Sequence, residues 1–243
     1  MNWGSIEQVS LKDLQELRGN RYVFFSMLFL PVILLSISII ETTATMSTAN
    51  VSPAEILILV STFANIIILI PAIVSVLVGS TSVVIEKNNR SLEPLLATPI
   101  TDTELLVGKA LAPFVPAMIL GFGAYAAFIP AIDYLTYPAF HTYLFPNTEM
   151  LYQIFVLAPL VGLFGTFVAL FISTKIKDVR AAQQISTLTV MPLFFTLIIG
   201  TIVLASSFYL LIAVSIFLAL AVLGFATLTI KQFNRETILI SWK

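Results

Sequence analysis

One segment of this sequence concentrates the polar residues whose types and spacing suit chemistry: residues 86 to 109, EKNNRSLEPLLATPITDTELLVGK. Hydroxyls and carboxylates spaced in this way form helix caps, and the leucines between them suit contact with a partner. The chain has no cysteine and a single histidine, His141, which excludes a thiolate site and a metal centre built from several histidines. The segment therefore predicts recognition of a partner, and no metal is expected.

The common catalytic and nucleotide-binding patterns do not occur in the sequence. There is no G-x-x-x-x-G-K-[ST] phosphate loop, so the chain is not expected to bind ATP by that route. Neither an H-E-x-x-H motif nor a pair of intramembrane aspartates is present, which argues against a membrane-embedded hydrolase. We expect the chain to be no enzyme by itself and to carry no cofactor.

The polar segment is predicted to form two short helices separated by a break. Ser91 is a suitable N-cap for a helix over residues 92–97, and Pro94 falls in its first turn, where a missing N–H is harmless. Pro99 forces the preceding residue out of the helical region, so this helix ends by about residue 98. The sequence Thr101-Asp-Thr-Glu104 is a capping box and predicts the start of a second helix.

The first of these helices carries Leu92, Leu95 and Leu96 at spacings that place them on one face. A helix of about seven residues is not stable alone in water. Two interpretations remain: the leucines enter a groove of a partner, or they pack against the inner ends of the chain's own helices or into the membrane interface.

The elements that must position this segment are membrane-spanning helices. Of 243 residues, 58% are hydrophobic and 10% charged, against about 25% charged in a typical soluble domain. Pro71 is expected to kink the longest apolar run. The predicted fold class is an all-α membrane protein, one domain over residues 1–243, whose six spans occupy about 22–40, 56–85, 110–132, 150–173, 185–205 and 209–230.

Basic residues set the predicted orientation. All twelve fall on one side of a six-span arrangement, whereas Glu41, Glu55, Asp133 and Glu149 fall on the other. Positive-inside bias then places both termini and segment 86–109 in the cytoplasm, with the chain in the plasma membrane. The basic residues are Lys12, Arg18, Arg21, Lys87, Arg90, Lys109, Lys175, Lys177, Arg180, Lys231, Arg235 and Lys243.

A short amphipathic helix is expected before the first span, over residues 10–18. Ser10 and Asp13 have the spacing of a capping box, leucines follow at three-residue intervals, and Gly19 supplies a C-terminal stop. Such a helix lies flat in the inner membrane interface with its leucines toward lipid. It is either a passive anchor or an elbow that moves with the first span.

Two further groups of side chains are candidates for contacts. Asn65 and Thr62, in the second run, line a transport path or bond across the helix bundle, and the interhelical bond is favoured. The aromatic residues of the outer loop 133–149, DYLTYPAFHTYLFPNTE, suit the membrane interface, which is favoured over a ligand cage.

The pattern E-x-x-x-x-S-L-E-P-L-L-A-T-P-I-T-x-x-E-L-L-x-G-K, from Glu86 to Lys109, resembles the permeases of the ATP-binding-cassette type-2 exporter family. The family often has Gly-Thr where this chain has Arg90-Ser91, and serine retains the capping role. The six spans, inside termini and N-terminal elbow are similar too. The connector STKIKDVRAAQQ, residues 173–184, is similar to the second inner loop of sodium- and drug-exporting members.

The resemblance implies an exporter permease whose segment 91–97 is a coupling helix that docks on a cytoplasmic ATPase subunit. ATP and magnesium would bind to that ATPase, and a second permease, identical or different, would complete the complex in a prokaryotic membrane. The implied coupling residues are Glu86, Arg90, Ser91, Leu92, Glu93, Leu95, Leu96 and Pro99, and the implied second contact comprises Lys175, Lys177, Asp178 and Arg180.

The sequence leaves open both the substrate and two other classes of protein. Lipids, hydrophobic drugs, peptides and ions are all compatible substrates, and no nucleic-acid partner is expected. One rival class is an ATP-independent membrane scaffold or assembly factor. The other is a secondary transporter, which the lack of ionisable residues near the middle of the spans disfavours.

Overall fold

The computed structural model describes residues 3–19, 21–47, 52–88, 100–143, 145–204 and 208–232. Regular structure in these ranges is helical, and no strand occurs within them. Five helices among the described residues are long and apolar enough to cross a membrane, namely Val23–Met46, Pro53–Glu86, Asp102–Phe140, Thr148–Lys175 and Phe208–Gln232. The prediction of an all-α chain with several helices long and apolar enough to span a membrane is confirmed for these residues.

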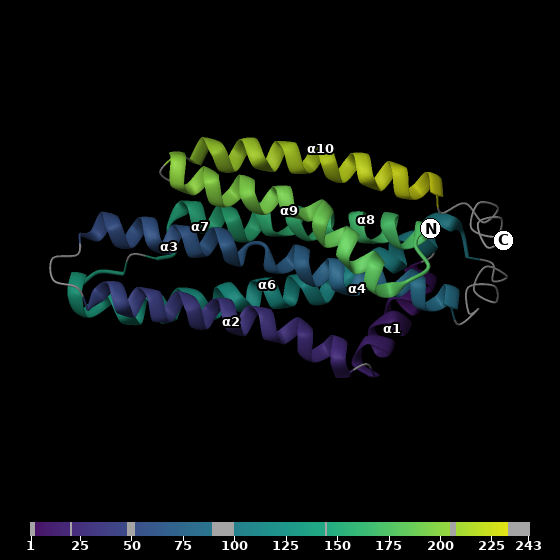
Figure 1. Cartoon of the computed structure of the whole chain (residues 1–243), viewed down its shortest axis with the longest axis horizontal. Coiled ribbons are helices and arrows are strands. Elements are labelled where there is room, and N and C mark those ends of the chain that lie inside the picture. The colour runs from purple at the N-terminus through teal and green to yellow at the C-terminus, as the bar shows by residue number, and fades with distance from the viewer. Residues whose placement is uncertain are drawn as a thin grey trace.

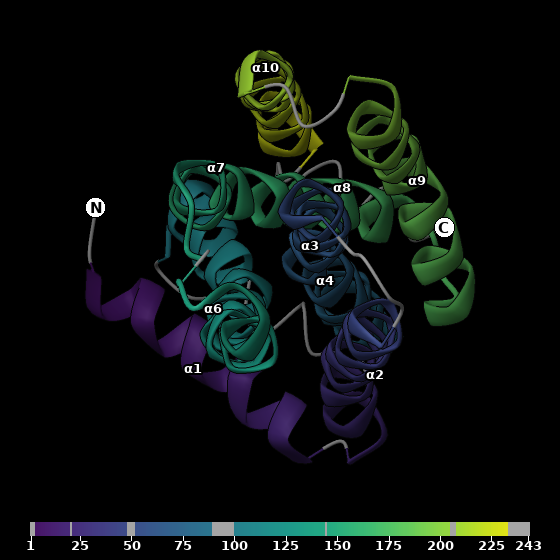
Figure 2. The same ribbon diagram turned by 90° about the vertical axis from the view of Figure 1, so that its left-hand side faces the viewer.

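The long helices run side by side along the long axis of the molecule (Figure 1). They are α2 (Arg21–Met46), α3 (Pro53–Ile67) with α4 (Ile70–Asn88), α6 (Asp102–Phe140), α8 (Ala158–Lys175), α9 (Val179–Leu204) and α10 (Phe208–Gln232). Figure 2 shows α3 and α4 surrounded by α2, α6, α8 and α9, with α10 outermost against α8. The centre of the bundle is therefore the second apolar run of the sequence.

That run breaks where proline predicts a kink. α3 ends at Ile67, Ile68 and Leu69 form a turn, and α4 begins at Ile70. Pro71 has no N–H to donate to the carbonyl of Ile67, four residues earlier, and its ring clashes with that carbonyl. At the other end of α3, Ser52 and Glu55 form a capping box that the sequence analysis did not identify.

The other spans are longer than predicted or contain an irregularity. α6 has 39 residues, about 58 Å at a rise of about 1.5 Å per residue, against a hydrocarbon core of about 30 Å. It starts at the predicted capping box, because Thr101 and Glu104 each bond to the other's backbone N–H. The fourth run begins with α7 (Thr148–Tyr152), passes through a π-helical segment, η1 (Gln153–Leu157), and continues as α8.

Glycines allow α4 to approach its neighbours around Pro71. A Cβ added at Gly121 of α6 would lie 2.5 Å from the nearest atom of the Pro71 ring, and one added at Gly162 of α8 would lie 3.3 Å from that ring. At Gly165 the same atom would lie 2.6 Å from the carbonyl oxygen of Ala72. This packing therefore requires glycine at Gly121 of α6 and at Gly165 of α8, which contact the first turn of α4.

The N-terminal helix differs from its prediction. α1 runs from Trp3 to Gly19, so it starts well before residue 10 and stops at the predicted glycine. The predicted capping box of Ser10 and Asp13 is wrong: Ser10 lies inside the helix and its hydroxyl donates to the carbonyl of Glu7. Asp13 is buried, at 5% exposure, where its carboxylate meets charges from other helices.

α1 crosses one end of the bundle obliquely beneath α6 (Figures 1 and 2). Its inward face is formed by Ile6, Val9 and Asp13, all buried, whereas Leu11 is exposed. The Val9 side chain lies against Gly108 of α6, where an added Cβ would come within 2.8 Å. α1 is thus held by protein contacts as well as by whatever membrane contact its outer face makes.

We expect Gly165→Ala to lower the thermal unfolding midpoint of the purified protein in nanodiscs. The added methyl group meets the backbone of α4, which cannot rotate away, and overpacking of this kind costs about 1–3 kcal/mol. Gly224→Ala in α10 is the matched control, because nothing lies within 4 Å of its added Cβ. Equal midpoints for the two variants would contradict the close packing of α4 and α8.

Candidate functional site

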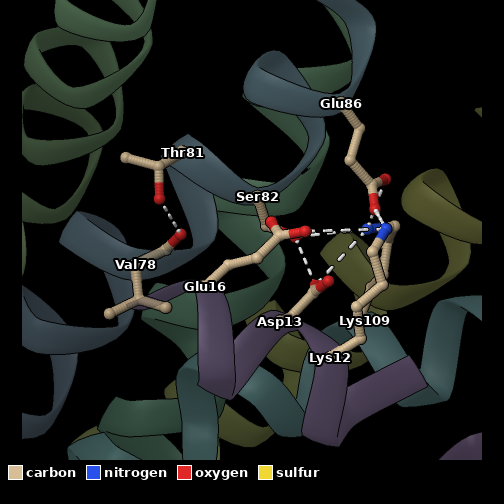
Figure 3. A network of polar contacts seen from close by, with 8 residues as sticks. All are labelled: Lys12, Asp13, Glu16, Val78, Thr81, Ser82, Glu86 and Lys109. Carbon is tan, nitrogen blue, oxygen red and sulfur yellow. Dashed lines mark hydrogen bonds and ion pairs between the residues drawn. The ribbon is translucent and has the colours of Figure 1, made fainter. Parts of the chain in front are cut away.

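A buried charge cluster joins three helices at the end of the bundle where α1 crosses. Asp13 comes from α1, Glu86 from the last turn of α4, and Lys109 from the second turn of α6 (Figure 3). The Lys109 side chain is fully buried, and those of Glu86 and Asp13 are 2% and 6% exposed. Burial of three ionisable groups is costly unless they pair, so their geometry decides what the cluster does.

Lys109 lies between the two carboxylates. Its Nζ is 2.6 Å from Oε2 of Glu86 and 3.4 Å from Oδ2 of Asp13. It also donates a hydrogen bond to the hydroxyl of Ser82, at 3.3 Å, and that hydroxyl donates to Asp13 Oδ2 at 2.7 Å. One ammonium group thereby ties α1, α4 and α6 together.

Lys12 closes the cluster on its solvent side. Its Nζ donates to Oε1 of Glu86 at 2.9 Å and lies 3.8 Å from Glu16, and its side chain is 39% exposed. Burial opposes the charge on Lys12, but the hydrogen bond and the charge of Glu86 outweigh it, so the pKa of Lys12 lies above its ordinary value of 10.5. Glu86 is thus held by two lysines, one buried and one accessible.

The local sequence explains how α6 presents Lys109. The capping box at Thr101 and Glu104 fixes the first turn of α6. Leu105 and Leu106 then pack in a small cluster with Val9 and Val83, which seats the start of α6 against α1 and α4. The charges are therefore shielded by an apolar layer on the loop side.

Glu86, which the resemblance placed at the contact with a partner, is buried inside the bundle. Its carboxylate is paired with Lys109 and Lys12 and does not reach the surface. The other predicted coupling residues, Arg90, Ser91, Leu92, Glu93, Leu95, Leu96 and Pro99, lie outside the described residues.

The predicted second contact, within residues 175–180, lies beside the end of α4, where segment 86–109 begins. Asn88, the last residue of α4, donates a hydrogen bond to the backbone carbonyl of Lys177 at 3.4 Å. Asp178 caps α9 by accepting from the backbone N–H of Ala181, and Lys175 lies over the ring of Phe171. Lys175, Lys177, Asp178 and Arg180 are all exposed.

Asn65 makes an interhelical hydrogen bond. Its Oδ1 accepts from Nε2 of Gln153 at 2.8 Å, and both side chains are buried. Tyr125 of α6 donates to the carbonyl of Ala64 beside them, at 2.7 Å. Thr62 instead bonds to the carbonyl of Ile58 within its own helix. Gln153 opens the π-helical segment, so this polar contact sits next to an irregularity on each of two helices.

Sequence reasoning missed Asp13, Ser82 and Lys109 as members of one site. Asp13 fitted a capping pattern, Ser82 lies in an apolar run, and Lys109 was read as an inside charge and as the last residue of the exporter-like pattern. A signal was present: Glu86 and Lys109 are opposite charges that directly flank two apolar runs joined by one loop. Helices that enter and leave the same face of a bundle bring such flanking charges together.

No family model matches the chain, and no curated protein matches it.

We expect Lys109→Met to destabilise the protein by about 3–5 kcal/mol, because it leaves Glu86 and Asp13 buried without their common partner. Lys12→Met should cost much less, since that side chain is 39% exposed. The double variant Lys109→Met, Glu86→Gln should be more stable than Lys109→Met alone. Chemical unfolding in nanodiscs measures all three, and equal losses for the two single variants would contradict the arrangement.

The contribution of Lys12 should not change through neutral pH. A group whose pKa is raised in the folded state adds stability that is fully present below its unfolded pKa and is lost as pH rises through its folded pKa. We therefore expect the stability difference between wild type and Lys12→Met to be constant from about pH 6 to about pH 9 and to shrink only above 10.5. Unfolding of both proteins across this range is the measurement. If the stability difference between the two proteins already declined near pH 7, Glu86 would be ruled out as the group that raises the pKa of Lys12.

Proposed function

We propose that this chain is the membrane-spanning permease subunit of an ATP-driven exporter that uses a separate cytoplasmic ATPase. The resemblance of residues 86–109 to type-2 exporter permeases supports this proposal. The all-helical bundle and its membrane-spanning helices are compatible with it. The chain would lie in a prokaryotic plasma membrane and pair with a second permease, identical or different.

The proposed topology has six spans with both termini in the cytoplasm. α9, a helix of 26 residues, supplies a sixth long helix beside the five that meet the length and hydropathy requirements. In Figure 1 the end of α4, the start of α6, the start of α9 and the end of α10 all lie at the end where α1 crosses. Under this topology that end is cytoplasmic.

One observation carries the proposal: the ion pair of Glu86 and Lys109 lies across the base of the loop that resembles a coupling helix. The two residues are the first and last of the segment and their charged atoms are 2.6 Å apart. Asp13 adds α1 to the same ion cluster. A force applied to residues 91–97 by an ATPase would therefore reach α1, α4 and α6 together, and α4 packs on α2, α6, α8 and α9.

A proton-coupled transporter is the second candidate, and the buried charge cluster favours it. Ionisable groups inside helices often form proton relays in such proteins. Transport by the purified chain in vesicles with a pH gradient and no ATPase would support this class. In the exporter proposed above, the same vesicles transport nothing until the ATPase and ATP are added.

The ATPase partner is tested by affinity purification of the tagged chain from cells that contain the ATPases of the source organism. We expect an ATP-binding-cassette ATPase to co-purify with wild type and to be lost with Leu95→Asp, Leu96→Asp. Gln15→Glu is the control, because it adds a carboxylate at an exposed position of α1, outside segment 86–109. Equal recovery of the ATPase with all three proteins would show that residues 91–97 are not the docking element.

A further inference from the structure

A cavity of about 620 Å³ lies at the opposite end of α6 from the charge cluster. The last turns of α6 and the residues that follow the helix form its wall, among them Pro130, Asp133, Tyr134, Tyr137, Tyr143 and Phe145. Ligand pockets commonly have volumes of about 300–1,000 Å³ and an apolar lining with a few polar groups. This cavity has that size and composition.

A turn at the end of α6 brings aromatic rings together. His141, the C-cap, takes a left-handed backbone conformation with φ of 51° and reverses the chain. Tyr143 then lies against Tyr137 one turn back, with ring centroids 5.1 Å apart and planes tilted by 30°. Tyr134 lies one turn earlier on α6. Tyr134 is 81% exposed, Tyr137 43% and Tyr143 76%. Their rings therefore remain open to a ligand.

A carboxylate lies in the same wall, fixed by the backbone. Asp133 is 9% exposed, and its Oδ1 accepts a hydrogen bond from the N–H of Phe145 at 3.2 Å. Among the described residues that line the cavity there is no lysine or arginine. The lining therefore combines negative charge with the electron-rich faces of tyrosine rings, the combination that attracts cations.

Anchoring in the membrane interface explains single exposed tyrosines but not this arrangement. An anchor needs rings at the height of the lipid headgroups, and it needs neither a concave wall nor a buried carboxylate in that wall. Small metal ions do not fit the site either, because they require several oxygen ligands at short range, and no cluster of three or more acidic or histidine side chains occurs in the described part of the chain.

We propose that this cavity binds the quaternary ammonium group of an organic cation, with the tyrosines around the cation and Asp133 as its counter-charge. The site lies on the outer side under the topology proposed above, but the inference does not depend on an ATPase. A choline group could come from a free cation or from the headgroup of a lipid in the outer leaflet. Both present the same chemistry to the rings.

Binding of choline to the purified chain in phosphatidylglycerol nanodiscs tests the proposal. Saturation-transfer NMR compares choline with 3,3-dimethyl-1-butanol, which has the same shape and no charge. We expect wild type to bind choline and to bind the neutral compound far more weakly. Equal binding of the two would overturn the proposal.

Two variants connect this preference to the cavity. Asp133→Asn keeps an oxygen that accepts from the N–H of Phe145 and removes the charge, so the preference for choline should be lost. Tyr143→Leu should weaken choline binding about two- to fivefold, whereas Tyr143→Phe, which keeps the ring, should not. Unchanged choline binding by Asp133→Asn in a protein with wild-type unfolding behaviour would also overturn the proposal.

Phosphatidylcholine nanodiscs then distinguish the two sources of the cation. Weaker binding of free choline in these nanodiscs than in phosphatidylglycerol would assign the site to lipid headgroups. Equal binding in the two lipids would assign it to free cations. Because these measurements need no ATPase and no ATP, their failure would leave the exporter proposal intact, and failure of the exporter proposal would leave them interpretable.

Discussion

A buried lysine between two carboxylates is the interaction on which the end of the bundle crossed by α1 depends. Lys109 has no contact with solvent, so its charge is compensated by Glu86 at 2.6 Å and Asp13 at 3.4 Å. The desolvation cost of such groups is large, and removal of one partner leaves the others uncompensated. α1 cannot leave α6 without exposing or stranding one of these charges, which gives a short N-terminal helix a fixed position.

Under the exporter proposal, the same cluster would give the loop between α4 and α6 a mechanical role. The ion pair of Glu86 and Lys109 joins the two ends of this loop. Glycines of α6 and α8 also pack closely against α4 around Pro71. Close-packed interfaces of this kind transmit displacement because they have little room to deform. The break between α3 and α4, beside the hydrogen bond of Asn65 to Gln153, interrupts this helix, so α3 is not a rigid extension of α4.

Features that depend on neighbouring residues in the sequence were predicted, whereas the charge cluster was not, because its members are distant in sequence. The capping box at Thr101 and the break before Pro71 depend only on neighbours in sequence, and both were predicted. The capping box at Ser10 failed because Asp13 bonds to groups 69 and 96 residues away. The π-helical segment at Gln153 left no pattern that the sequence analysis detected, and Tyr143 reaches Tyr137 only because of the left-handed turn at His141.

The most direct test is a spin-label distance between α1 and α6. Nitroxides at the exposed positions Gln15 and Thr103 report whether α1 stays seated, and double electron–electron resonance gives their distance distribution in nanodiscs. If Lys109 holds α1, the distribution is narrow with Lys109 present and broadens or shifts to longer distance in Lys109→Met. An unchanged distribution in that variant would contradict the central claim that the buried ion cluster joins α1, α4 and α6 into one unit.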